Sequence, residues 1–260
     1  MPEILDTCVR AARSGGEVLL DWMGRFNVRE KGPRDLVSEA DLAAQEAIAR
    51  IVLADFPDFD FLGEEDTSSE RSLSNHEYCW IVDPLDGTTN YVHGLQSFAV
   101  SIGLARAGKV VCGVVYDPIA EECYTAVEGG GAHLNGRPIS VSRCEQIDQS
   151  LLAASFPPKV ARDSQEVRQF VEVLTECQAV RRLGSAALNL CYVAAGRLDG
   201  YWATSVKIWD VAAGVLIIQE AGGIVTSIDG SPFVLEQPRF VSASTQPLLD
   251  RLVATLKRAD

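Results

Sequence analysis

Apolar residues recur at helical spacing in two stretches near the start of this 260-residue chain. In residues 3–23 they fall every three or four positions, which predicts one amphipathic helix. A second helix is expected to begin after Ser38, a candidate N-cap, and to end before Pro57. Its expected buried stripe consists of Leu42, Ala44, Ala47, Ile48, Ile51 and Val52. The charged stretch 29–35 between the two helices predicts a loop.

Short apolar or alternating runs predict strands in the next part of the chain. They are residues 59–62, 78–82, 98–104, 110–116 and 123–127. The dipeptides Ala107-Gly108 and Asn135-Gly136 have the residue types of tight hairpin turns. The first half therefore predicts two helices followed by a mostly antiparallel sheet.

Strands and helices alternate after about residue 143. The expected strands are 151–155, 199–202, 224–225 and 240–242, and the expected helices are 164–177, 185–195, 210–221 and 246–258. This alternation favours a layered α/β half. We therefore expect an N-terminal α+β subdomain over residues 1–143 and a C-terminal α/β subdomain over residues 144–260, joined in one compact unit.

Composition and charge narrow the classes of partner. A hydrophobic content of 47% with 23% charged residues is that of a globular protein. The net charge of −13 argues against a general basic surface for nucleic acid or an anionic membrane, so neither partner is expected. Seven scattered cysteines, no signal peptide pattern and no run of ~18 apolar residues predict a cytoplasmic protein.

The segment from Asp83 to Asn90 carries the clearest chemical signal, and it reads Asp-Pro-Leu-Asp-Gly-Thr-Thr-Asn. Its two carboxylates, Asp83 and Asp86, directly follow an apolar run, where a bound cation would neutralise them. The backbone amides of residues 87–89 would face an anion if a helix begins there. The alternative is a helix capped by aspartate after a tight turn.

Two further acidic segments have simple explanations when each is taken alone. Gly63-Glu64-Glu65-Asp66 matches a solvated acidic loop. The Asp210 carboxylate in Trp-Asp-Val-Ala-Ala-Gly, residues 209–214, matches a helix N-cap. The three histidines, at positions 76, 93 and 133, are scattered and form no ligand cluster.

Taken together, these three segments resemble the inositol monophosphatase family. Lesser matches are Asp35-Leu36-Val37-Ser38 with Asp41, Asn135-Gly136-Arg137-Pro138-Ile139 and Gly184-Ser185-Ala186-Ala187. All of them occur in family order, between about residues 4 and 255. The resemblance implies a layered α-β-α-β-α sandwich of the inositol monophosphatase and fructose-1,6-bisphosphatase type. It also implies a phosphoric monoester hydrolase that is commonly a homodimer and commonly inhibited by lithium.

The resemblance implies two to three Mg²⁺ ions, with Mn²⁺ as a substitute. By matching position, the first ion would be held by Glu64, Asp83 and the carbonyl of Leu85. The second would be held by Asp83, Asp86 and Asp210, and a third, largely hydrated ion would lie near Glu64. Carboxylate, carbonyl and water oxygens are ligands that suit these cations. The loop 31–35 resembles the mobile metal-associated loop of the family, and Gly32 and Pro33 equally fit an ordinary turn.

The implied reaction is direct attack of a metal-activated water on a phosphate monoester, without a phosphoenzyme. Glu64 and Thr88 would position the water and take its proton, and Asp41 would orient Thr88. The substrate would be bound by Asp86, by the amides of Gly87 and Thr88, and by the pocket segment Gly184, Ser185 and Ala186.

The segment before Asp210 departs from the inositol-specific pattern. Those members carry an acidic residue seven positions earlier, and here that residue is Ala203. Trp202 and Lys207 nearby would suit another organic phosphate, or they are a packed and a solvated side chain. The alternative substrates are therefore histidinol phosphate, fructose 1,6-bisphosphate and 3′(2′),5′-bisphosphate nucleotides. The alternative from another class is a non-catalytic regulatory module on the same fold.

Overall fold

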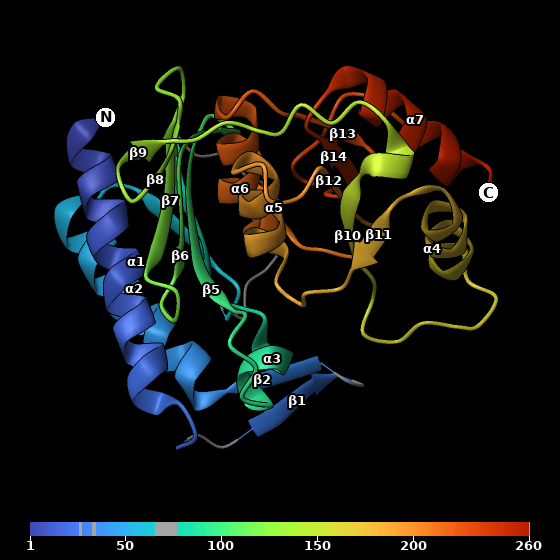
Figure 1. Ribbon diagram of the computed structural model, residues 1–260. Coiled ribbons are helices and arrows are strands. Elements are labelled where there is room, and N and C mark those ends of the chain that lie inside the picture. Colours follow the sequence, from blue (N-terminus) through green and yellow to red (C-terminus); the bar gives the residue numbers. More distant parts are fainter. Residues whose placement is uncertain (26–27, 33–34, 66–76, 260) are drawn as a thin grey trace.

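Five alternating layers of helices and sheets make up the computed structural model, which describes residues 1–25, 28–32, 35–65 and 77–259 (Figure 1). Two helices cover the outer face of a seven-stranded sheet, two lie between this sheet and a five-stranded sheet, and two cover the far side. In that order the pairs are α1 (Pro2–Trp22) with α2 (Glu39–Asp55), α5 (Ala186–Ala194) with α6 (Ile208–Glu220), and α4 (Gln165–Glu176) with α7 (Gln246–Lys257). The expected α-β-α-β-α sandwich is confirmed.

The seven-stranded sheet belongs to the first half of the chain, and its strands follow one another in sequence order. They are β3 (Asp60–Gly63), β4 (Tyr78–Asp86), β5 (Ala99–Arg106), β6 (Lys109–Asp117), β7 (Glu122–Val127), β8 (Ala132–Leu134) and β9 (Arg137–Pro138). Only β3 and β4 pair in parallel. The two predicted hairpin turns are confirmed, because Ala107-Gly108 and Asn135-Gly136 all have positive φ angles, as mirror-image turns require.

The five-stranded sheet belongs to the second half and has the order β11-β10-β12-β14-β13. Its strands are β10 (Leu151–Ser155), β11 (Ala179–Arg181), β12 (Gly200–Ala203), β13 (Ile224–Ser227) and β14 (Phe240–Ala243), and the 3₁₀ turn Ile147–Gln149 precedes β10. β10 pairs in parallel with both β11 and β12, so three carboxyl ends meet at one edge of this sheet. Such an edge is where open α/β sheets bind ligands.

Helix α6 packs closely on the first sheet because small residues meet there. A Cβ atom on Gly113 of β6 would lie 2.9 Å from the carbonyl oxygen of Ala213, closer than real Cβ contacts. On β5, a Cβ on Gly103 would lie 3.1 Å from the Cβ of Ala212. This packing explains the small residues that follow Asp210, and it fixes the N-terminus of α6 against the sheet.

The structure contradicts three local expectations. The charged stretch 29–35 is no loop, since β1 (Val28–Gly32) and β2 (Asp35–Ser38) form an antiparallel hairpin. Strand β11 was not expected either, because its three residues are too few for a readable pattern. Leu42 is 49% exposed, whereas Asp41 is 1% exposed, so Leu42 lies outside the buried stripe of α2, although Ala44, Ile48 and Val52 are buried as expected.

Some expectations fall outside the described residues. These are Asp66, His76 and positions 33 and 34 of the loop expected at 31–35. All seven cysteines are described and carry free thiols, and five of them are buried, as expected for small apolar residues. Within the described ranges, no helix is both long and apolar enough to cross a membrane.

Candidate metal and phosphate site

Strands β3 and β4 bring the first two acidic residues together. The two strands are parallel, with Gly63 paired to Val82, so Glu64 and Asp83 follow neighbouring strand positions. The Glu64 amide donates to the Val82 carbonyl over 3.0 Å, which fixes the backbone at the end of β3. Asp83 is 1% exposed. The pairing of β4 with β5 then shifts register after Asp83, where Pro84 has no amide hydrogen to donate.

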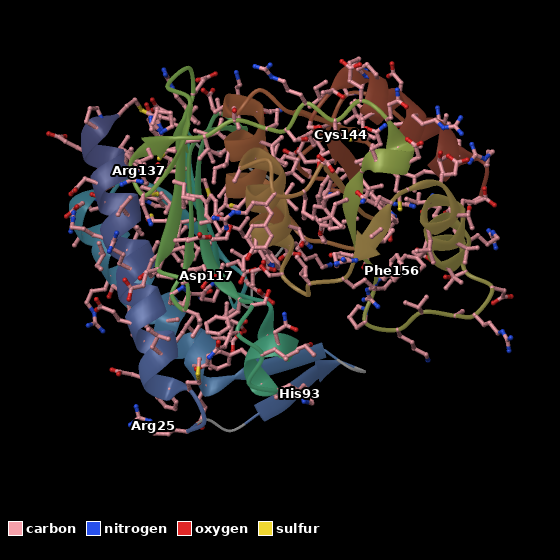
Figure 2. All side chains as sticks on the ribbon, in the orientation of Figure 1. Arg25, His93, Asp117, Arg137, Cys144 and Phe156 are labelled. Atoms are coloured by element: carbon pink, nitrogen blue, oxygen red, sulfur yellow. The ribbon has the colours of Figure 1, made fainter. Side chains whose placement is uncertain are left out.

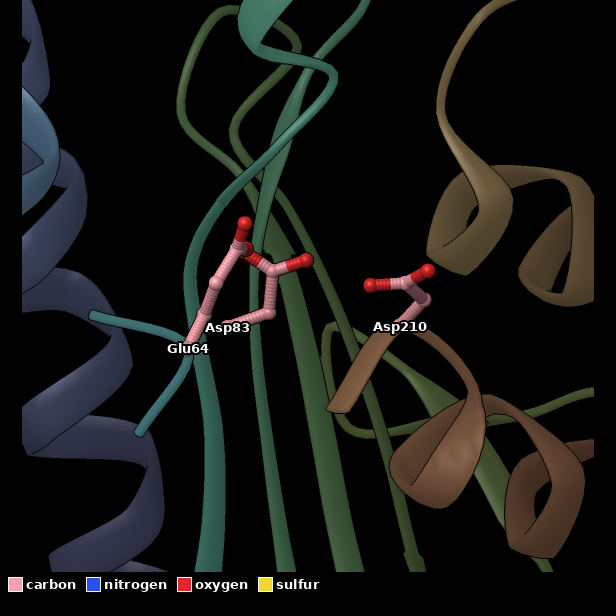
Figure 3. A group of neighbouring side chains, drawn as sticks. All are labelled: Glu64, Asp83 and Asp210. Atoms are coloured by element: carbon pink, nitrogen blue, oxygen red, sulfur yellow. The ribbon is translucent and has the colours of Figure 1, made fainter. Parts of the chain in front are cut away.

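Asp210 completes a group of three carboxylates. One oxygen from each of Glu64, Asp83 and Asp210 lies within 4.8 Å of the others. Figure 3 shows the Asp210 carboxylate pointing from α6 towards the other two. The Asp210 carboxylate also accepts a hydrogen bond of 2.8 Å from the Lys207 amide at the start of α6. Asp210 is not the N-cap that the sequence predicted, because Lys207 holds that position and Asp210 is the third residue of α6. Its carboxylate caps the Lys207 amide from there and also joins the acidic group.

Burial makes this negative charge unfavourable. Desolvation raises the pKa of the Asp83 carboxyl well above its usual value, and the charges of Glu64 and Asp86 raise it further. Desolvation and then the Asp86 charge raise the pKa of Asp210 in the same way. Among the described residues, no lysine or arginine forms an ion pair with Asp83, Asp86 or Asp210. A divalent cation with a preference for oxygen ligands fits this uncompensated group.

Asp86 is close to this group but has other partners. Its carboxylate accepts hydrogen bonds from the Ser185 hydroxyl and from the amides of Ala186 and Ala187, the last two at 3.1 and 2.8 Å. Desolvation raises the pKa of Asp86 to about 6, although the Ser185 hydrogen bond lowers it. The Ser185 hydroxyl also caps α5, since it accepts from the Leu188 amide over 3.1 Å. Asp86 therefore joins the end of β4 to the N-terminus of α5.

Thr88 begins the short helix α3 (Thr88–Val92), directly after Gly87. The φ angle of +100° at Gly87 is one that glycine adopts without strain. The Thr88 hydroxyl donates to the Leu85 carbonyl over 3.1 Å and lies 3.5 Å from the carboxylate of buried Asp41. The expected pairing of Thr88 with Asp41 is therefore present as a long contact, and the Leu85 carbonyl is the nearer partner.

Asn90 and Gly184 connect α3 to the segment before α5. The Asn90 amide group donates to the carbonyls of Ser97 and Leu183, both over 2.7 Å. Gly184 has a φ angle of +90°, and a Cβ atom there would lie 2.5 Å from Asn90 Nδ2. Glycine is thus required at position 184 both by its backbone conformation and by the close approach of Asn90.

A cleft of about 760 Å³ lies beside these elements, and Gly87, Thr88, Gly184 and Asp210 line it. Asp86, Ser185 and Ala186 are buried and are not among its lining residues. The far wall comes from residues that the motifs did not indicate, among them Phe156 and Arg182. Phe156 follows the carboxyl end of β10 (Figure 2). Phe156 follows β10 and Arg182 follows β11, and the parallel pairing of these two strands in the structure brings the two residues to one side of the cleft.

The residues around the inositol-specific position are mostly buried. Ala203 and Trp202 are fully buried in the core, while Lys207 is exposed. The interpretation of Trp202 as a packed side chain and of Lys207 as a solvated one is confirmed. His93 is exposed and His133 is half-buried, and neither belongs to the acidic group.

Comparison with known proteins covers the whole chain. The model of the inositol monophosphatase family matches residues 1–260. The inositol-1-monophosphatase of Mesorhizobium japonicum is 41% identical over 245 residues, which span 93% of this chain and 91% of that protein. The Nus factor SuhB of Pseudomonas aeruginosa is 39% identical over 255 residues, which span 95% of this chain and 93% of that protein. The crystal structure of the extragenic suppressor protein suhB from Bartonella henselae has a TM-score of 0.91 and 37% identity, and the match covers 98% of this chain and 99% of that one.

Proposed function

The chain belongs to the inositol monophosphatase family, and we propose that it is a Mg²⁺-dependent phosphomonoesterase. Its substrate is a small polyol phosphate or a related organic phosphate, hydrolysed by direct attack of water. The observation that carries the proposal is the convergence of Glu64, Asp83 and Asp210 beside a cleft of about 760 Å³. A cation that neutralises these carboxylates next to an accessible cavity would attract a phosphate group.

The expected ligand set remains the one that the family resemblance implies. Glu64, Asp83 and the Leu85 carbonyl would hold the first ion, and Asp83, Asp86 and Asp210 the second. When bound, Mg²⁺ supplies charge neutralisation for the phosphate and lowers the pKa of the attacking water. The hydrogen bonds from Ser185, Ala186 and Ala187 keep the Asp86 carboxylate in one orientation.

Side chains at the start of α3 and directly after β3 orient the water. Thr88 and Glu64 accept hydrogen bonds from it, and Glu64 takes its proton. Asp41 acts through Thr88 as a positioning residue, because its carboxylate is an acceptor for the Thr88 hydroxyl proton. Gly87 and Thr88 line the cleft, and in this proposal their amides hold the phosphate oxygens.

Phosphate release from a panel of esters tests this function. The panel comprises inositol 1-phosphate, histidinol phosphate, fructose 1,6-bisphosphate, adenosine 3′,5′-bisphosphate and glycerol 2-phosphate, each with Mg²⁺, with Mn²⁺ and with a chelator. We expect release that requires the metal and a range wider than inositol 1-phosphate, because Ala203 leaves no carboxylate at the inositol-specific position. Turnover of inositol 1-phosphate alone would contradict the wider range. A homodimer, inhibition by lithium and a cytoplasmic location stay predictions.

A regulatory role is the second candidate function. What favours it is the name Nus factor SuhB, carried by relatives that are 37 to 40% identical to this chain. The expectation that this protein has no nucleic-acid partner is therefore not supported by the names of these relatives. Complementation of cells that lack this protein distinguishes the regulatory role from the catalytic one. If Asp83→Asn restores normal growth while it abolishes phosphate release, the cellular role is regulatory; if it fails to restore growth, the role depends on catalysis.

A further inference from the structure

The cleft contains one cationic side chain among its described lining residues, and that side chain is Arg182. Among the residues that the structure describes, the one acidic side chain lining the cleft is Asp210, which belongs to the proposed metal site. Once metal ions neutralise the carboxylates, Arg182 is the charge that faces the rest of a bound ester. Its position is notable because the whole protein carries a net charge of −13.

An aromatic side chain holds Arg182 in place. The guanidinium carbon of Arg182 lies 4.6 Å from the centre of the Phe156 ring. Phe156 packs edge-on against Phe170 of α4, with ring centres 5.5 Å apart at an angle of 84°. Stacking uses the face of the guanidinium and leaves its N–H edge free for a bidentate anion. In the described part of the chain, no carboxylate pairs with Arg182.

In the described part of the chain, the cleft has no second acidic lining residue that would accept a sugar hydroxyl. Ala203 stands at the inositol-specific position and is fully buried in the core. The neighbouring residue that reaches the cleft is Ser205, which is neutral and exposed. Among its described lining residues the cleft therefore offers one cation, Arg182, and no acidic residue apart from the proposed metal ligand Asp210.

We propose that Arg182 determines specificity by binding a second anionic group of the substrate, distinct from the phosphate that is hydrolysed. The proposal rests on the phosphatase function proposed above. Phe156 acts as the positioning residue for the guanidinium, while Gly87 and Thr88 hold the other phosphate. The substrate class is a small hydroxylated phosphate ester that carries a further phosphate or carboxylate.

Matched pairs of substrates test the proposal. Fructose 1,6-bisphosphate is compared with fructose 1-phosphate, and 2-phosphoglycerate with glycerol 2-phosphate, so that each pair differs by one anionic group. In Arg182→Gln, the ratio of kcat/KM within a pair should fall about 10- to 100-fold, mostly through KM, because a charge-assisted hydrogen bond is lost. The pair with the larger fall identifies phosphate or carboxylate as the preferred group.

The neighbouring arginine supplies the control. Arg181 is exposed, donates to the Val180 carbonyl and does not line the cleft, so Arg181→Gln should leave both ratios unchanged. Arg182→Lys retains the charge but loses the planar fork, and it should recover only part of each ratio. Ratios in Arg182→Gln that equal those of the wild type, or an equal fall in Arg181→Gln, would overturn the proposal.

Binding without turnover separates this proposal from the phosphatase function. Calorimetry with fructose 1,6-bisphosphate is carried out on Asp83→Asn and on the double variant Asp83→Asn/Arg182→Gln, both with Mg²⁺. The double variant should bind about 10- to 100-fold more weakly. Equal affinities would overturn the Arg182 subsite whatever the turnover, whereas absence of hydrolysis in the wild type would refute only the phosphatase function.

Discussion

The carboxylate of Asp86, at the end of β4, accepts a hydrogen bond from the hydroxyl of Ser185, the N-cap of α5, although 99 positions separate the two residues. Asp86 comes from the half of the chain up to residue 143, and Ser185 comes from the half that follows. This hydrogen bond places the N-terminus of α5 beside the acidic group. We propose that the two halves form one unit at this site and are not independent modules.

Removal of the Ser185 hydroxyl should weaken metal binding. In Ser185→Ala, α5 loses its cap and Asp86 loses a donor that holds its pKa down, so we expect about 1 kcal/mol lower stability and weaker Mg²⁺ binding. Thr245→Ala is the matched control, because Thr245 caps α7 through the Leu248 amide far from the acidic group. Chemical unfolding and calorimetry should show both variants destabilised but only Ser185→Ala impaired in Mg²⁺ affinity. Equal Mg²⁺ affinity in the two variants would contradict this role.

The stabilisation by Mg²⁺ should increase with pH. The pKa of Asp86 is about 6 in the fold and those of Asp83 and Asp210 are also raised, so protons compete with the metal at low pH. Because these folded-state pKa values exceed the unfolded ones, ionisation destabilises the metal-free fold as the pH rises through that interval. The increase in Tm caused by Mg²⁺ should therefore be larger at about pH 7.5 than at about pH 5. A Tm increase that is the same at both pH values would argue against metal binding by these carboxylates.

Alanine at position 184 should disturb both the fold and the site. Gly184→Ala must strain a φ of +90° and displace the Asn90 amide, so a loss of about 2–4 kcal/mol in the free energy of unfolding is expected. Gly222→Ala is the control, because Gly222 has a similar φ of +88° and nothing within 4 Å of the added Cβ. In urea unfolding, the control should lose only about 1 kcal/mol in the free energy of unfolding. If the two variants lose equal stability, the contact with Asn90 is unimportant.

The sequence indicated the acidic residues because each follows a strand or begins a helix with a readable pattern. Asp83 follows an apolar run, and Asp210 lies in the first turn of a helix whose small residues fit against Gly113. Leu42 was placed inside the core because hydrophobicity alone sets the expected stripe, whereas the first turn of α2 buries Asp41 beside Thr88 and leaves Leu42 exposed.

The far wall of the cleft could not be found in this way. Phe156 and Arg182 come from two separate loops next to β10 and β11, and only the tertiary structure stacks them. A single sequence contains no signal for a contact between residues that belong to no common motif. The hairpin β1–β2 escaped detection for a related reason, since its charged residues do not alternate with apolar ones.

The most direct test of the proposed function is Mg²⁺-dependent phosphate release by the wild type, by Asp83→Asn and by Asp117→Asn. Asp117 is a matched control because it is another buried aspartate at the end of a strand, and it accepts hydrogen bonds from the amides of Ile119 and Ala120, away from the acidic group. We predict that Asp83→Asn lowers kcat/KM at least about 100-fold with its fold intact by circular dichroism, while Asp117→Asn retains catalysis. Metal-dependent hydrolysis by Asp83→Asn at the wild-type rate, or a folded wild type that hydrolyses no phosphate ester with Mg²⁺, would contradict the proposal.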